Sequence, residues 1–105
     1  KWGIHGFMKT LAMEAGPFGI RANAIAPGCV EGARIDGVIE REASKKKTTP
    51  DVIREAYKSG TSLKTFVKAE DIASMALFLA SDQASRISGQ VIAVDGHTEN
   101  PDPKI

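Results

Sequence analysis

The sequence predicts an α/β fold in which helices alternate with the strands of a parallel sheet. The first observation is the helical spacing of apolar residues over 1–15 and again over 69–81. The second is a pair of short apolar runs, 20–25 and 90–94, with the length and composition of strands. The third is their order, because strands separated by helical segments are typical of parallel α/β sheets.

Residues 1–15 have apolar side chains at helical spacing and predict a helix. Gly16-Pro17 ends this helix, since glycine suits the left-handed position after a helix and proline cannot continue one. Nothing caps the start, and a lysine at a true helix N-terminus would oppose the helix dipole. We therefore expect the helix to begin upstream of Lys1, in a longer protein. Its apolar residues share one face: Ile4, Phe7, Met8, Leu11, Ala12 and Ala15.

The two predicted strands are short and end in turns. Residues 20–25 carry small side chains, which allow helices to pack closely on both faces of a sheet, and Pro27-Gly28 follows them. Residues 90–94 read QVIAV and lead into Asp95-Gly96. Parallel sheets are covered on both faces and usually contain several strands. Two strands therefore predict a fold that is incomplete by itself.

The stretch 31–65 between the strands is polar and mostly helical. Residues 33–43 can form a short helix. Thr49 has the character of an N-cap, and Pro50 fits the first position of a second helix that runs to about Lys58.

Residues 69–81 give the clearest helical pattern. Glu70 and Asp71 lie in the first turn, where the helix dipole favours acidic side chains. Residues 98–105 form a polar tail that contains two prolines and is expected to be extended. The helix has a predicted buried stripe of Ile72, Met75, Ala76 and Leu79, widened by Ala73 and Ala80.

Composition excludes several function classes. The 105 residues hold 14 Lys+Arg against 13 Asp+Glu, and a net charge of +1 argues against an electrostatic nucleic-acid or membrane partner. The triplet Lys45 to Lys47 is then a solvated loop rather than a binding patch. One cysteine, Cys29, cannot form an internal disulfide. The longest apolar run, 75–80, is too short to span a membrane, so we expect a cytoplasmic setting.

Three stretches, taken in order, resemble a known family. They are KWGIHGFMKTLAMEAGPFGIRANAIAPGCVEG, then AEDIASMALFLASD, then SGQVIAVDGH. They are similar to the C-terminal part of the short-chain dehydrogenase/reductase family, whose members have one Rossmann-like domain. The resemblance implies that residues 1–97 contribute the last two strands and flanking helices of a doubly wound parallel sheet. It also implies that 31–65 is the substrate-binding insertion.

Lys1 stands where the family has the lysine of its Tyr-x-x-x-Lys signature. The resemblance implies a catalytic and cofactor-binding role for Lys1, with a tyrosine four residues upstream. Residues four apart share a helix face. A lysine there can contact the nicotinamide ribose and lower the tyrosine pKa from about 10, so that the tyrosine acts as acid or base. Without the resemblance, Lys1 would be an ordinary surface lysine.

The resemblance also assigns the segment after the first strand. It implies that Pro27 and Gly28 run beside the nicotinamide and that the backbone near Val30 hydrogen-bonds the carboxamide. The alternative is an ordinary turn that ends a strand. Many relatives carry threonine where this chain has Gly32, so one contact to the cofactor is expected to be missing.

Four further residues invite a role. Arg34 and Asp36 open the insertion and could meet a polar substrate, or they could be exposed charges on a surface helix. Cys29 is interpreted as a small packing residue, because no base is placed to activate it. His97 replaces the second glycine of a frequent VDGG. Neither this histidine nor any other has metal-ligand spacing.

The leading prediction is an NAD(P)-dependent oxidoreductase of which this chain is the C-terminal part. It would move a hydride between nicotinamide and a carbonyl or secondary alcohol, with either NAD or NADP as cofactor and a homodimer or homotetramer as the assembly. The alternative is a non-catalytic structural or oligomerisation piece that binds no cofactor. A tyrosine upstream of Lys1, and a glycine-rich loop before it, would distinguish the two.

Overall fold

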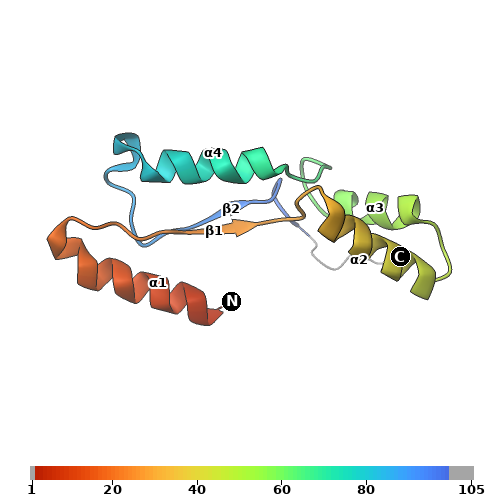
Figure 1. Ribbon diagram of the computed structural model, residues 1–105, viewed down its shortest axis with the longest axis horizontal. Helices are drawn as coiled ribbons and strands as arrows, with labels where there is room; N and C mark the ends of the chain where they lie inside the picture. The colour runs from red at the N-terminus through yellow and green to blue at the C-terminus, as the bar shows by residue number, and fades with distance from the viewer. Residues whose placement is uncertain (1, 100–105) are drawn as a thin grey trace.

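The computed structural model describes residues 2–99 and confirms the predicted α/β class. The sheet lies between α4 on one face and α1 on the other, while α2 and α3 extend beyond the end toward which the strands point (Figure 1). In chain order the elements are α1 (Trp2–Ala15), η1 (Gly16–Phe18), β1 (Ala24–Pro27), α2 (Ala33–Lys45), α3 (Pro50–Ser59), α4 (Ala69–Ala80), η2 (Asp82–Ala84) and β2 (Val91–Val94).

The sheet consists of β1 and β2 paired in parallel. Ala24 lies opposite Val91, and the register continues to Pro27 opposite Val94. The whole stretch between the strands forms the crossover that a parallel pair requires. Within residues 2–99, no helix has both the length and the hydropathy needed to cross a membrane.

The first strand begins later than the sequence predicts. The structure places β1 at Ala24–Pro27 rather than at 20–25. Ahead of it, the Ala22 N–H donates to Ser88 Oγ at 3.1 Å, and Asn23 Nδ2 donates to the Ile87 carbonyl at 3.0 Å. Because these polar side chains take up the backbone groups, the regular ladder starts only at Ala24.

The apolar faces of α1 and α4 are less covered than their patterns predict. In α1, Met8 is buried, but Ile4 and Phe7 are 68% and 70% exposed. In α4, Leu79 is buried, whereas the alanines of the predicted stripe (Ala73, Ala76 and Ala80) are exposed. The predicted buried stripe of α4 is therefore too wide, because it included these alanines. Two strands of four residues each offer too little sheet surface to cover both helices.

A second and separate core lies between α2 and α3, which together are called the α2–α3 hairpin. Ile39 and Ile53 are fully buried there, and Ala43 and Phe66 complete the cluster. The predicted N-cap is confirmed, since the Val52 N–H donates to Thr49 Oγ1 at 3.4 Å. The hairpin thus has its own hydrophobic support.

Glu42 accepts one hydrogen bond from α3 and one from the end of its own helix, and its carboxylate responds to acid. Tyr57 Oη donates to Glu42 Oε2 at 2.7 Å, and Lys46 Nζ donates to Glu42 Oε1 at 2.9 Å. The bonds from Tyr57 and then from Lys46 hold the pKa of Glu42 below its ordinary value of 4.5. A carboxylate with a lowered folded-state pKa stabilises the fold above the unfolded value and loses that effect as pH falls.

We expect acid to weaken the hairpin through Glu42. Between about pH 6 and pH 3, the melting temperature should fall more steeply for the wild-type protein than for Glu42→Gln. Circular dichroism melts across this range give the measurement. Parallel curves for the two proteins would show that Glu42 does not contribute.

Candidate functional site

The candidate site lies at the carboxyl ends of β1 and β2, the edge where open α/β sheets bind ligands. After β1, the Gly28 N–H donates to the Val94 carbonyl at 3.0 Å, which brings the two strand ends together. A Cβ on Gly28 would lie 2.6 Å from Asp95 Cβ and 2.8 Å from Asp95 Cα. Glycine is therefore required here by close approach of the backbones, a reason that the sequence pattern alone does not give.

Val30 presents an open backbone edge next to this turn. It pairs with Val67 in a parallel bridge, in which the Val67 N–H donates to the Cys29 carbonyl at 3.0 Å. The Glu31 N–H in turn donates to the Val67 carbonyl at 2.8 Å. Backbone groups alternate in direction along an extended chain, so Val30's own N–H and C=O point away from Val67. No hydrogen bond within residues 2–99 uses either of them.

An N–H and a C=O from one extended residue match the hydrogen-bonding groups of a carboxamide. The donor meets the amide oxygen, and the acceptor meets the amide nitrogen. Val30 is only half-buried, so a ligand can reach this edge. The residues present therefore fit the nicotinamide carboxamide that the resemblance implies.

Gly32, where many relatives carry threonine, has a backbone conformation that favours glycine. It is the N-cap of α2, with φ 148° and ψ −174°, and makes no side-chain capping bond. This conformation is open to glycine and strained for other residues. A threonine would have free space for its Cβ but an unfavourable backbone. The turn into α2 is thus shaped around glycine, and the loss of one cofactor contact at this position stays a prediction.

Arg34 and Asp36 do not share a role. Arg34 is exposed in the first turn of α2. Asp36 Oδ1 accepts a hydrogen bond from Arg54 Nη2 at 2.8 Å, which joins α2 to α3. The Arg54 guanidinium also lies 5.9 Å from the centroid of the Phe66 ring. Asp36 therefore has a structural partner within the hairpin that the sequence pattern did not indicate.

Cys29 packs against the core of the α2–α3 hairpin. Burial raises the pKa of its thiol, which keeps it protonated and unreactive. This agrees with its interpretation as a packing residue. Across residues 2–99, no three His, Cys, Asp or Glu side chains gather into a group that could hold a metal ion. Lys1 lies outside the described residues.

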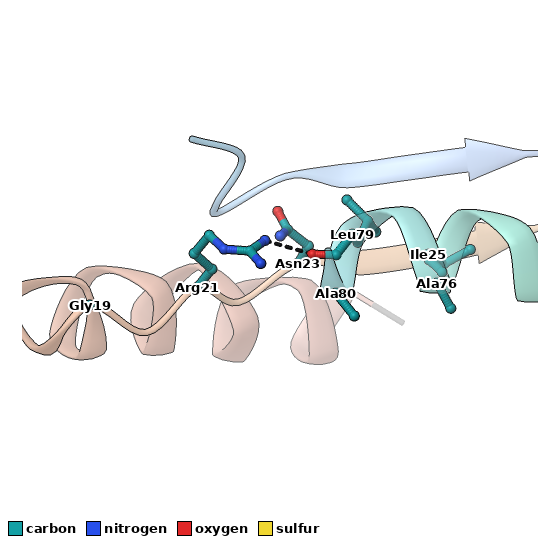
Figure 2. A pocket seen from close by; sticks show the side chains of 7 residues that line it. All are labelled: Gly19, Arg21, Asn23, Ile25, Ala76, Leu79 and Ala80. Carbon is teal, nitrogen blue, oxygen red and sulfur yellow. Dashed lines mark hydrogen bonds between the residues drawn. The ribbon is translucent and has the colours of Figure 1, made fainter. Parts of the chain in front are cut away.

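A hollow between β1 and α4 lies at the other end of the sheet (Figure 2). Arg21 reaches across it, and its Nη1 donates to the Leu79 carbonyl at 2.6 Å. A cation that hydrogen-bonds the last carbonyls of a helix satisfies them and complements the helix dipole. This hydrogen bond joins the segment before β1 to the last turn of α4, and it is separate from the rim at Val30.

Comparison with known proteins identifies the family. A family model described as Enoyl-(Acyl carrier protein) reductase matches residues 1–97. The D-beta-hydroxybutyrate dehydrogenase of Rhizobium meliloti (strain 1021) is 37% identical over 97 residues, which are 91% of this chain and 38% of that protein. A crystal structure of a short chain dehydrogenase family protein from Francisella tularensis matches with a TM-score of 0.86 and 26% identity, over 91% of this chain and 40% of that one.

The chain therefore belongs to the short-chain dehydrogenase/reductase family. It spans well under half the length of the relatives it matches.

Two further structures in this family contain nicotinamide cofactors. The L-sorbose reductase of Gluconobacter frateurii, complexed with NADPH and L-sorbose, has a TM-score of 0.80 and 25% identity, over 91% of this chain and 37% of that one. A 4-hydroxyisoleucine dehydrogenase complexed with NADH has a TM-score of 0.66 and 32% identity, over 90% of this chain and 34% of that one. The family neighbours thus include one protein bound to NADPH and another bound to NADH.

Proposed function

We propose that this chain is the C-terminal part of an NAD(P)-dependent oxidoreductase that transfers a hydride between nicotinamide and a carbonyl or secondary alcohol. The single observation that carries the proposal is the open N–H and C=O of Val30 at the carboxyl rim of the sheet. Family membership supports it, as do the relatives named as dehydrogenases and reductases.

Each part of the chain takes a place in this proposal. Residues 1–97 complete one Rossmann-like domain, in which 31–65 covers the substrate, and 98–105 is the tail. Pro27 and Gly28 carry the backbone to the rim, and Val30 orients the carboxamide. The bound nicotinamide supplies or accepts the hydride. Arg34, exposed at the start of α2, remains the candidate for a polar substrate contact.

Lys1 supplies the remaining part of the chemistry through its charge. Its ammonium hydrogen-bonds the ribose and favours the ionised form of the partner tyrosine, which lowers that tyrosine's pKa toward neutral pH. The tyrosine then exchanges a proton with the substrate oxygen. The cofactor is NAD or NADP, since the residues that choose between them lie in the part of the family's fold outside this chain.

Removing the Val30 donor tests the proposed site. In the natural protein that carries this chain, Val30→Pro eliminates the N–H, and we expect cofactor affinity to fall by about tenfold, the equivalent of one hydrogen bond. The matched control is Val30→Ala, which keeps the backbone donor and should bind nearly as the wild type does. Fluorescence titration with NADH and NADPH measures both. Equal affinities for the two variants would rule out the Val30 contact.

A non-catalytic assembly role is the second candidate, and the exposed apolar residues of α1 favour it. Trp2 and Met13 are 87% and 78% exposed, as an interface would require. The same surface also fits burial within a larger domain or a homodimer or homotetramer. Cofactor binding separates the two functions, because the assembly role needs none.

A further inference from the structure

Hydrogen bonds attach the α2–α3 hairpin to the rest of the described chain at two places. At its base, Val30 pairs with Val67, which joins the segments that enter and leave the hairpin. Every other hydrogen bond between residues 32–66 and the remainder of residues 2–99 runs to residues 96–99. These lie just after β2. Among residues 2–99, the hairpin, which has its own core, is therefore hydrogen-bonded at its base and at one further attachment.

The backbone part of this attachment is a short antiparallel pairing. The Ser62 N–H donates to the His97 carbonyl at 2.9 Å, and the Leu63 N–H donates to the Gly96 carbonyl at 3.1 Å. The Glu99 N–H donates to the Gly60 carbonyl at 2.7 Å. Thr61 and Thr98 face each other within it. A few exposed backbone bonds open easily on their own.

Three side chains reinforce this pairing. Ser62 Oγ donates to Glu99 Oε1 at 2.6 Å and also hydrogen-bonds His97 Nδ1. A hydroxyl has one hydrogen, so the imidazole Nδ1–H must be the donor in the second bond. The resulting order is histidine to serine to glutamate. A nucleophilic serine would instead have the histidine between the serine and the acid. The cluster is therefore a link and not a catalytic triad.

The backbone of His97 adopts a strained conformation. His97 has φ 65°, in the left-handed region that glycine adopts freely and other residues enter with strain. Strained positions persist where the surrounding contacts hold them. Here the contacts are the bond to Ser62 and the Asp95 carboxylate, which accepts from the His97 N–H at 2.8 Å.

We propose that Ser62, His97 and Glu99 form a latch that holds the α2–α3 hairpin against the carboxyl end of β2. Because Val30 lies at the base of the hairpin, the latch also fixes the open Val30 edge relative to the sheet. These contacts lie within the fold, so the latch does not depend on a bound cofactor.

Hydrogen–deuterium exchange of the natural protein that carries this chain tests the latch. We expect His97→Gly and Ser62→Ala each to speed exchange at least fivefold at the paired amides of residues 62, 63 and 99, with little change in α1 or β1. The matched control is Lys47→Gly, which places glycine at another strained position, φ 55°, away from the latch. It should leave exchange at these amides unchanged.

Whether exchange becomes faster or slower in these variants shows whether the three side chains hold the pairing together. If the imidazole does nothing, His97→Gly only relieves strain, and slower or unchanged exchange would overturn the proposal. The double variant should exchange no faster than Ser62→Ala alone, because both changes break the same link. Additive effects of the two substitutions would also contradict the latch. Ser62→Ala introduces no backbone change, so it provides the test even if a glycine variant fails to fold.

Discussion

Replacing Ile53 with alanine is expected to lower the free energy of unfolding of the α2–α3 hairpin by about 2–5 kcal/mol. Ile53 is fully buried between α2 and α3, where it packs with Ile39 and Phe66. Truncation removes buried methylene groups and leaves a cavity that a four-residue core cannot refill. Chemical denaturation followed by circular dichroism gives the measurement.

The neighbouring Val52 offers a matched control for this prediction. Val52 is 46% exposed on the same helix, so Val52→Ala removes a similar amount of side chain without opening a cavity. We expect its effect to stay within about 0.5 kcal/mol. Similar losses for the two variants would show that the hairpin has no core of its own.

Gly28→Ala is expected to destabilise the protein by about 1–3 kcal/mol and to shift the rim of the site. The new Cβ would lie 2.6 Å from Asp95 Cβ and 2.8 Å from Asp95 Cα, distances that require the strand ends to separate. Separation would also stretch the bond from the Gly28 N–H to the Val94 carbonyl. Cofactor binding should weaken together with stability, because Val30 follows two residues later.

The control for Gly28 is a glycine with free space around it. Gly6 lies inside α1, and a Cβ there would have no neighbour within 4 Å. Gly6→Ala should stabilise the protein by about 0.5–1 kcal/mol, since alanine is the better helix former. Thermal unfolding of both variants shows whether the two substitutions have opposite signs. A neutral Gly28→Ala would mean that the strand ends do not approach as described.

Local signals in the sequence predicted most of the elements. The Thr49-Pro50 start of α3 and the acidic first turn of α4 depend on nearby residues, and both are found. The chain order of helices and strands was enough to predict the parallel pairing of β1 and β2. These features need no knowledge of distant contacts.

Features that depend on distant contacts could not be predicted from the sequence. The start of β1 depends on Ser88, whose side chain takes the Ala22 N–H. The bond between Asp36 and Arg54 joins residues eighteen positions apart, and no local pattern indicates it. The exposed faces of α1 and α4 reflect how little sheet is available, and periodicity does not report this.

Some residues of the candidate site and of the latch were indicated by the sequence, and others were found only in the structure. The motif resemblance pointed to Pro27, Gly28 and Val30, and the structure adds the open backbone groups at Val30. Ser62 and Glu99 carried no signal that would have singled them out. His97 did, because a histidine stands where glycine is frequent, and its positive φ explains why that position favours glycine.

Cofactor titration of the natural protein that carries this chain tests most directly whether the chain completes a nicotinamide-binding oxidoreductase. We expect saturable binding of NADH or NADPH. We also expect Lys1→Met to lose affinity by about tenfold or more, because it removes one charge-assisted hydrogen bond to the ribose. If the folded protein binds neither nucleotide, the chain does not belong to a nicotinamide-binding enzyme.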